Sequence, residues 1–226
     1  MNSLPAVIFD MDGVIFDTER AVISCWKTLS ETYDLPDIEN ICIECIGTTS
    51  EMTRSIMLRH YGNDFPYDEL SEQVTLIFRQ RYSGRNLPVK NGAEHILSHL
   101  KAAGIKVALA SSTRSDTVKR ELADTGLIDY FDIIVGGEMA ARSKPAPDIF
   151  LMAAEKLAAG SSPDYFYVIE DSYNGIRAAH AAGMHPIMVP DILQPDEEIL
   201  SLAEIVLPDL IAAADWLLSG PHRILR

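Results

Sequence analysis

The chain has 226 residues, of which 47% are hydrophobic, and its mean hydropathy is +0.05. This composition suits a packed globular protein and excludes a disordered chain, which would carry fewer apolar residues. The 19 basic and 33 acidic residues give a net charge of −14 and a pI near 4.7. Such a surface repels nucleic acid and anionic membranes, so we expect neither as a partner. An anionic substrate would need a locally positive pocket.

The beginning of the chain bears on where the protein works. Residues 1–5 carry no basic region of the kind that opens a signal peptide, and no apolar run approaches the length of a membrane span. We therefore expect a cytoplasmic protein. The sequence leaves its oligomeric state open between a monomer and a weak homodimer.

The cysteines number 3, which is too few for a disulfide framework. Cys42 and Cys45 form a C-x-x-C pair, a spacing found in some redox and zinc sites. The pair lies in the apolar, helix-like segment 41–46, without the further His or Cys ligands that a zinc site needs. We interpret the pair as structural, and the sequence leaves a redox role open.

The first predicted element is a buried strand over the apolar run Ala6 to Phe9. Three aspartates follow it closely, at Asp10, Asp12 and Asp17. For Asp17 we expect a capping role at the next helix, because Asp is favoured at helix N-caps. Amphipathic helices without strands come next, and are predicted over 21–33, 51–61 and 67–82.

From Pro88 onward, strands and helices alternate along the chain. The predicted strands are 105–110, 132–135, 165–169, 186–189 and 205–207. The predicted helices are 92–103, 115–125, 146–159, 174–182 and 210–218. Alternation of this kind gives right-handed β-α-β units and a doubly wound parallel sheet, to which the first strand also belongs. We therefore predict an α/β core domain of residues 1–17 and 85–226, interrupted by an all-helical cap domain of residues 18–84.

Polar side chains follow several of these predicted strands at the point where each strand ends. They are Asp10, Asp12, Ser111, Ser112, Glu170 and Asp171, with Lys144 in the turn before the helix at 146. In open parallel sheets, ligands bind outside the carboxyl ends of the strands. We therefore expect these side chains to meet at one edge of the sheet.

This set of groups favours phosphoryl-transfer chemistry. Carboxylates clustered without His or Cys favour a hard, oxygen-preferring cation, and Mg²⁺ fits best. Ser111 and Lys144 are suited to hold phosphate oxygens. One carboxylate could then attack phosphorus and form an aspartyl-phosphate. A second carboxyl group two residues away could protonate the leaving oxygen and later activate water.

The same segments resemble the four sequence motifs of the haloacid dehalogenase superfamily, in matching order and spacing. They are Asp10-Met11-Asp12-Gly13-Val14, Ser111 after an apolar strand, Lys144-Pro145-Ala146-Pro147-Asp148, and Glu170-Asp171. The resemblance covers essentially the whole chain, and it implies a Rossmann-like core with a helical cap inserted after the first motif.

The resemblance also implies a role at each matching position. Asp10 would be the nucleophile and would touch Mg²⁺, while Asp12 would be the general acid/base and would ligate the metal through its backbone carbonyl. Asp171 and Glu170 would hold the metal. The phosphoryl group would be held by Ser111, Ser112 and Lys144. Asp at position 12 favours phosphatase or phosphomutase chemistry, because members of the superfamily that displace a halide from carbon need no second carboxyl group there.

Within the superfamily, the chain is similar to the subgroup of β-phosphoglucomutase and small phosphometabolite phosphatases. Mutases of this subgroup carry a histidine where this chain has Val22, and an arginine in the stretch that is Gly47 to Glu51 here. Arg54, one turn further along, could substitute for that arginine. These departures favour a phosphatase acting on a sugar phosphate or a nucleoside monophosphate, with a sugar phosphomutase or a non-catalytic binding protein as alternatives. The candidate specificity residues are Glu19, Arg20, Thr48 and Arg54.

Short segments are also similar to pseudouridine-5′-phosphatase-like proteins. They are Phe9 to Gly13 continuing through Asp17 to Arg20, and Met188 to Asp191. The similarity suggests a class of substrate and no more than that.

Overall fold

The parallel sheet that the alternating pattern predicts is present in the computed structural model, which describes residues 5–219. Within these residues, six parallel strands form one sheet in the order β3-β2-β1-β4-β5-β6. The strands are β1 (Ala6–Phe9), β2 (Val107–Ala110), β3 (Ile133–Val135), β4 (Phe166–Glu170), β5 (His185–Met188) and β6 (Ile205–Val206). The α/β fold class is therefore confirmed, and each strand lies at or within three residues of its predicted position.

Strand β1 lies inside the sheet because its residues are apolar on both faces. Val7 pairs in register with Val107 of β2 on one side and with Tyr167 of β4 on the other. All four residues of β1 are buried, as expected for a parallel strand that is covered above and below. The position of β1 fixes where the aspartates that follow it emerge.

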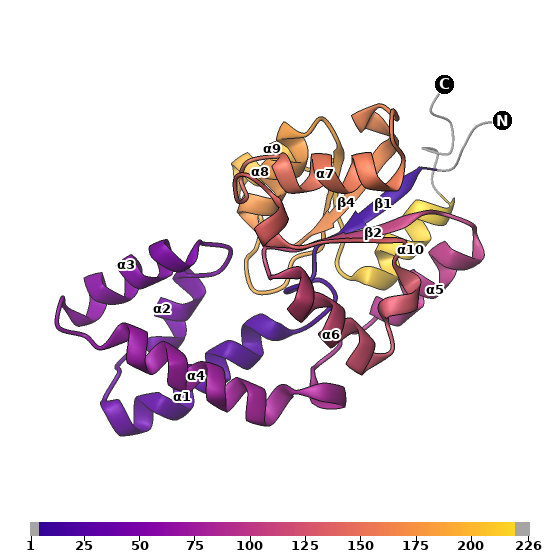
Figure 1. Ribbon diagram of the computed structural model, residues 1–226. Helices are drawn as coiled ribbons and strands as arrows, with labels where there is room; N and C mark the ends of the chain where they lie inside the picture. The colour runs from indigo at the N-terminus through magenta and orange to yellow at the C-terminus, as the bar shows by residue number, and fades with distance from the viewer. Residues whose placement is uncertain (1–4, 220–226) are drawn as a thin grey trace. The chain divides into compact units, whose positions relative to one another are not determined.

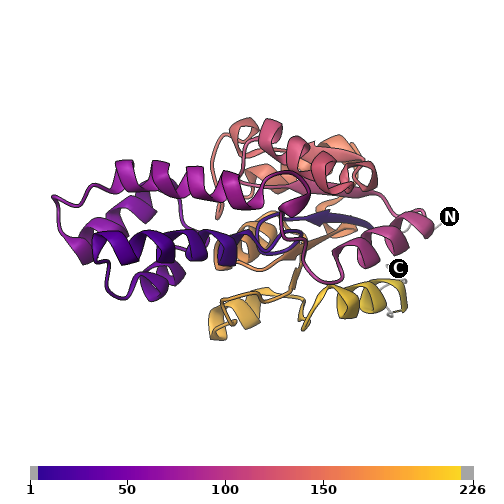
Figure 2. The ribbon, with the colours of Figure 1, turned by 90° about the horizontal axis from the view of Figure 1, so that it is seen from below.

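Two layers of helices cover the sheet (Figure 1). Helices α5 (Ala93–Ala102), α6 (Ser115–Thr125) and α10 (Leu210–Ser219) lie on one side, and α10 packs against α5 (Figure 2). Helices α7 (Asp148–Leu157), α8 (Tyr173–Ala181) and α9 (Glu197–Leu202) lie on the other. Ala6 and Ile8 point into the cluster of apolar residues under α7 and α8. The sheet thus forms the middle layer of a three-layer core.

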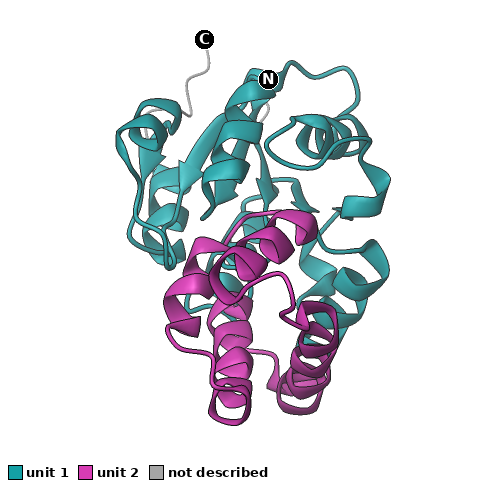
Figure 3. Ribbon diagram, turned by 90° about the vertical axis from the view of Figure 1, so that its left-hand side faces the viewer, with its two compact units in different colours: residues 1–16, 89–226 teal, residues 17–88 magenta. Residues whose placement is uncertain are grey.

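The chain divides into two compact units, coloured separately in Figure 3. Residues 1–16 and 89–226 form the unit that contains the sheet, called here the core unit. Residues 17–88 form the second, called the helical unit, which contains α1 (Thr18–Tyr33), α2 (Ile38–Glu44), α3 (Ser50–Tyr61) and α4 (Tyr67–Tyr82). In this unit α1 packs against α2 and α4, and Trp26 stacks on Tyr67 with ring centroids 6.2 Å apart. These bounds are close to those of the predicted insert.

Two details of the helices differ from the sequence-based expectation. Asp17 precedes α1, but its side chain accepts no capping hydrogen bond, because the backbone there adopts φ −83° and ψ 51° rather than the extended conformation of a cap. Its carboxylate lies 3.5 Å from Nε of Arg20 instead. Helix α9 was not predicted, since its six residues are too few to show a helical period. No helix in the described part of the chain combines the length and the apolar character needed to cross a membrane.

Candidate active site

Asp10 stands at the carboxyl end of β1, in the middle of the sheet. Its backbone N–H donates to the carbonyl of Ile169 in the neighbouring strand β4 (3.0 Å), which extends the sheet pairing to this residue. The Asp10 side chain is almost completely buried. The strand therefore presents a carboxylate to the sheet edge in an environment that contains little water.

Lys144 joins Asp10 to the end of β4. Its Nζ donates to Oδ1 of Asp10 (2.6 Å) and to Oε1 of Glu170 (2.7 Å), and the side chain is 7% exposed. Nζ also lies within 3.4 Å of the carbonyl oxygen of Ala110 and 4.8 Å from the ring centroid of Phe150. One buried ammonium group thus contacts two buried carboxylates.

Burial and the contacts between Lys144 and the carboxyl groups of Asp10 and Glu170 shift the pKa values of Lys144 and Asp10. Burial raises the pKa of Asp10 to about 8, an effect that Lys144 opposes and that the charges of Glu170 and Asp12 reinforce. Burial also acts to lower the pKa of Lys144, but the two carboxylates outweigh it, so the net pKa is raised and the lysine stays protonated. The site has negative charge in excess, which is a setting suited to a further cation.

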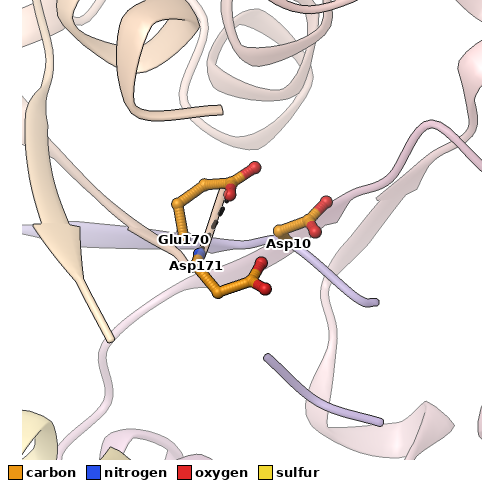
Figure 4. A group of neighbouring side chains, drawn as sticks. All are labelled: Asp10, Glu170 and Asp171. Carbon is orange, nitrogen blue, oxygen red and sulfur yellow. Dashed lines mark hydrogen bonds between the residues drawn. The ribbon is translucent and has the colours of Figure 1, made fainter. Parts of the chain in front are cut away.

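Glu170 is the last residue of β4 and Asp171 begins the turn into α8; both are buried. Oε2 of Glu170 accepts hydrogen bonds from the backbone N–H of Asp171 (3.0 Å; Figure 4) and from both N–H and Oγ of Ser172 (2.9 and 3.0 Å). Ser172 in turn caps α8 by accepting from the N–H of Gly175 (3.1 Å). The first turn of α8 therefore holds Glu170 in place, and Glu170 holds Lys144.

Two glycines allow the backbone to approach these carboxylates closely. Gly13 has φ +79°, and a Cβ there would overlap the carboxylate of Asp171. A Cβ at Gly175 would overlap the carboxyl group of Glu170. Only glycine fits at either position, and at Gly13 the positive φ adds a second reason.

Asp12 lies in the loop after β1 and is directed to different partners. Its Oδ2 accepts from Oγ1 of Thr113 (3.0 Å), and Oγ of Ser111 lies 3.5 Å away. Ser111 is fully buried at the end of β2, where its N–H donates to the carbonyl of Val135 (3.1 Å). Ser112 is exposed at the start of the following turn. Asp12 therefore sits beside two hydroxyl groups, while Asp10 sits beside the lysine.

Asp10, Glu170 and Asp171 form a group that could hold a metal ion. Each offers a carboxylate oxygen, and these oxygens lie within 4.8 Å of one another (Figure 4). An all-carboxylate donor set matches hard cations such as Mg²⁺. The expectation that the carboxylates meet at one sheet edge is met for these three. The carboxylate of Asp12 is not part of this group; the resemblance assigns that residue a backbone carbonyl as ligand.

The structure adds two polar residues that the sequence analysis missed. Thr113 contacts Asp12, and Ser172 contacts Glu170. A signal was present for Ser172, because a serine just before a predicted helix is a favoured N-cap. Thr113 lies two residues beyond the end of a strand, where spacing alone does not reveal which way a side chain points.

The candidate specificity residues belong to the helical unit, where Arg54 and Thr48 have clear partners. Arg54 forms a two-pronged ion pair with Asp68 (Nε–Oδ1 3.1 Å, Nη2–Oδ2 3.2 Å), and Oγ1 of Thr48 donates to the carbonyl of Cys45 (2.8 Å). Glu19 is half-buried in α1, one residue before Arg20. Arg54 is thus already neutralised by an acidic neighbour.

The C-x-x-C pair is not a disulfide in the structure, since both thiols are free. Burial raises the pKa of Cys42 to about 12 and that of Cys45 to about 11. A thiol whose pKa is raised so far is almost entirely protonated at neutral pH and is a poor nucleophile. These values agree with the structural interpretation of the pair.

The chain matches known proteins by family model, by sequence and by structure. A family model described as haloacid dehalogenase-like hydrolase matches residues 7–189. The chain is 34% identical to a Drosophila melanogaster protein named "Probable pseudouridine-5'-phosphatase". The aligned region is 188 residues long and covers 81% of this chain and 80% of that protein. It is 35% identical over 194 residues to the β-phosphoglucomutase of Bacillus subtilis, with coverage of 82% and 83%. The solved structure of CbbY from Rhodobacter sphaeroides in complex with phosphate has a TM-score of 0.74 and 25% identity, over 98% of this chain and 99% of that one.

Proposed function

This chain belongs to the haloacid dehalogenase-like hydrolase family, and we propose that it is a Mg²⁺-dependent phosphatase of small phosphomonoesters. The substrate would be a sugar phosphate or a nucleoside monophosphate, and the reaction would pass through a phosphate ester on Asp10. The relatives named above act on phosphorylated small molecules according to their names. Their chemistry is consistent with the groups at the sheet edge of this chain.

One observation carries the proposal. The buried carboxylate of Asp10 pairs with Lys144 at 2.6 Å and also belongs to the acidic group with Glu170 and Asp171. A nucleophile that attacks a phosphate must approach an anion, so it needs positive charge around it. Lys144 supplies one such charge, and a cation held by the carboxylates would supply the rest.

The donor set fits Mg²⁺. Asp10 and Asp171 would ligate the ion with their carboxylates and Asp12 with its backbone carbonyl. Both oxygens of Glu170 already accept hydrogen bonds, from Lys144 on one side and from the Asp171–Ser172 turn on the other. The main role of Glu170 would then be to fix Lys144. When bound, Mg²⁺ would stabilise the ionised form of Asp10 and withdraw charge from the phosphoryl oxygens.

The residues of this chain would divide the remaining work. Ser111, Ser112 and Lys144 would hold the phosphoryl group while an Asp10 oxygen forms a bond to phosphorus and the bond to the leaving oxygen breaks. Asp12 would give its proton to that leaving oxygen. Asp12 would then take a proton from a water molecule, whose oxygen attacks phosphorus and releases phosphate from Asp10.

A phosphomutase is the second candidate, favoured by the 35% identity to a β-phosphoglucomutase. A mutase must also retain a bisphosphate intermediate, which requires a second site for an anion. Arg54, the residue that could provide it, is paired with Asp68, and position 22 in α1 is a half-buried valine. These features support hydrolysis over transfer. We further propose residues 18–84 as the cap that selects the leaving group, with Glu19, Arg20, Thr48 and Arg54 as specificity residues.

The test is phosphate release from a panel of phosphometabolites, measured with Mg²⁺ and again with excess EDTA. We expect activity that requires the metal and disappears in Asp10→Asn, because the amide cannot attack phosphorus. Asp215→Asn, an exposed aspartate of α10, is the matched control and should retain full activity. Undiminished turnover by Asp10→Asn would rule out the covalent route. Conversion of β-glucose 1-phosphate to the 6-isomer without phosphate release would identify a mutase instead.

A further inference from the structure

Thr113 is held by its backbone in a fixed position beside Asp12. Its N–H donates to Oγ of Ser111 (3.0 Å), and its carbonyl accepts from the N–H of Gly137 (3.0 Å). Gly137 can come this close because it lacks a side chain: a Cβ there would overlap the carbonyl of Ser112. The backbone of Thr113 is therefore fixed by contacts within the core unit, and its hydroxyl lies 3.0 Å from Oδ2 of Asp12.

Asp12 has a well-defined backbone, but its side chain needs a separate restraint. The backbone pairs with Phe16 across the loop, and the N–H of Gly13 donates to the carbonyl of Phe16 (2.8 Å). These contacts place the Cα of Asp12 and leave its side-chain rotation to be set by other groups. The hydrogen bond from Oγ1 of Thr113 to Oδ2, at 3.0 Å, supplies that restraint.

Ser111 is less suited to this task. Its Oγ lies 3.5 Å from Oδ2 of Asp12, at the limit of a hydrogen bond, and it already accepts from the N–H of Thr113. In the proposed reaction the Ser111 hydroxyl would turn to a phosphoryl oxygen. Thr113 would then be the hydroxyl that stays with Asp12 while substrate is bound.

We propose that Thr113 is a positioning residue that orients the carboxyl group of Asp12 towards the leaving oxygen. This inference rests on the proposed phosphatase function, because it assigns Thr113 a part in proton transfer by Asp12. A misdirected acid has its effect mainly on substrates whose leaving group must be protonated. The role of Thr113 should therefore depend on the leaving group.

The experiment compares two substrates through kcat/KM, which reports the steps up to departure of the leaving group. One is p-nitrophenyl phosphate, whose leaving group is a stable anion and needs no proton. The other is the alkyl phosphate of the panel that the wild-type protein hydrolyses fastest. The variant is Thr113→Val, which has nearly the same shape and keeps the backbone bonds to Ser111 and Gly137.

We expect Thr113→Val to lower kcat/KM by about 10- to 100-fold with the alkyl phosphate and by less than about threefold with p-nitrophenyl phosphate. Thr113→Ser, which restores the hydroxyl, should recover the alkyl activity to within about threefold. Thr125→Val is the matched control, because that hydroxyl only donates to the carbonyls of Glu121 and Leu122 in the same helix. It should leave both substrates unaffected.

Equal losses with both substrates would overturn the inference, since they would indicate a general disturbance of the site. No loss with the alkyl phosphate, or no recovery in Thr113→Ser, would overturn it as well. A wild-type protein that hydrolyses neither substrate with Mg²⁺ would instead refute the proposed function, so the two failures are distinguishable.

Discussion

Replacement of Asp10 by asparagine should stabilise the metal-free protein although it removes the proposed nucleophile. In the folded chain, one buried ammonium group faces two buried carboxylates, those of Asp10 and Glu170. Burial raises the pKa of Asp10 from 3.8 to about 8. A pKa raised this far corresponds to on the order of 5 kcal/mol of free energy against the ionised form of Asp10. Asparagine avoids this cost and still offers Lys144 an oxygen, while Lys144 keeps its ion pair with Glu170.

The sign of the pH dependence follows from the two pKa values of Asp10. Below pH 3.8 the carboxyl group is protonated in both the folded and the unfolded chain, and the substitution has no electrostatic effect. Between pH 3.8 and about 8 the folded chain keeps a proton that the unfolded chain releases, so the wild-type protein loses stability relative to the variant as pH rises. Above pH 8 the difference is constant. Between pH 5 and pH 8 the stability difference should widen, with an upper limit on the order of 4 kcal/mol.

The assay is urea unfolding of wild type and Asp10→Asn at pH 5 and pH 8, with EDTA present so that no metal binds. Asp215→Asn, on the exposed face of α10, controls for the loss of one negative charge elsewhere. We expect Asp10→Asn to be more stable than wild type at pH 8, and the control to differ by less than about 0.5 kcal/mol. A variant that is less stable than wild type at pH 8 would refute the reasoning. It would mean that the ion pair with Lys144 outweighs the cost of burial.

Two further predictions concern groups that the proposed reaction does not use directly. Gly175→Ala should displace the carboxyl group of Glu170 from Lys144 and Ser172 and cost about 3–5 kcal/mol of stability. Thermal unfolding should show a lower midpoint. An unchanged midpoint would contradict the close approach of the Gly175 backbone to Glu170. Burial raises the pKa of Cys42 to about 12 and that of Cys45 to about 11. At pH 7 both thiols should therefore react with iodoacetamide at least about 100-fold more slowly in the folded protein than in urea. Mass spectrometry of the labelled chain measures both rates, and rapid labelling of the folded protein would show that the thiols are accessible and ionised.

The parts of the site that follow from a strand end were predictable from the sequence. Asp10, Ser111 and Glu170 each come directly after a run of apolar residues, and the carboxyl ends of neighbouring parallel strands must lie at the same edge of a sheet. The side chain that joins Asp10 to Glu170, Lys144, lies in a loop before α7. Its place in the turn before a predicted helix and its match to a motif made it a candidate, and its contacts to both carboxylates came from the structure.

What the sequence could not show were contacts set by local backbone geometry and by side-chain direction. Asp17 stands where a cap is expected, but its side chain accepts no capping hydrogen bond and lies beside Arg20 instead. Thr113 reaches Asp12 only because its backbone is fixed by Ser111 and Gly137, which come from different segments. Patterns of apolar residues report burial along one element, so they carry no information on such contacts between elements.

The order of strands in the sheet has a consequence for the way the chain folds during synthesis. Strand β1 leaves the ribosome well before both of its neighbours: Val7 pairs with Val107, and Ala6 pairs with Phe166, a separation of 160 residues. At about 5–20 residues per second, β1 waits roughly 8–30 s for its second partner. During that time one edge of this wholly apolar strand has unpaired backbone groups, although β2 and helices α5, α6 and α7 are synthesised before β4. Closing such long loops is also slow in refolding, because the entropy of closure is lost before the pairing is gained. A nascent chain of this protein is therefore a good substrate for chaperones that bind short apolar segments, until β4 has emerged and its pairing has covered β1.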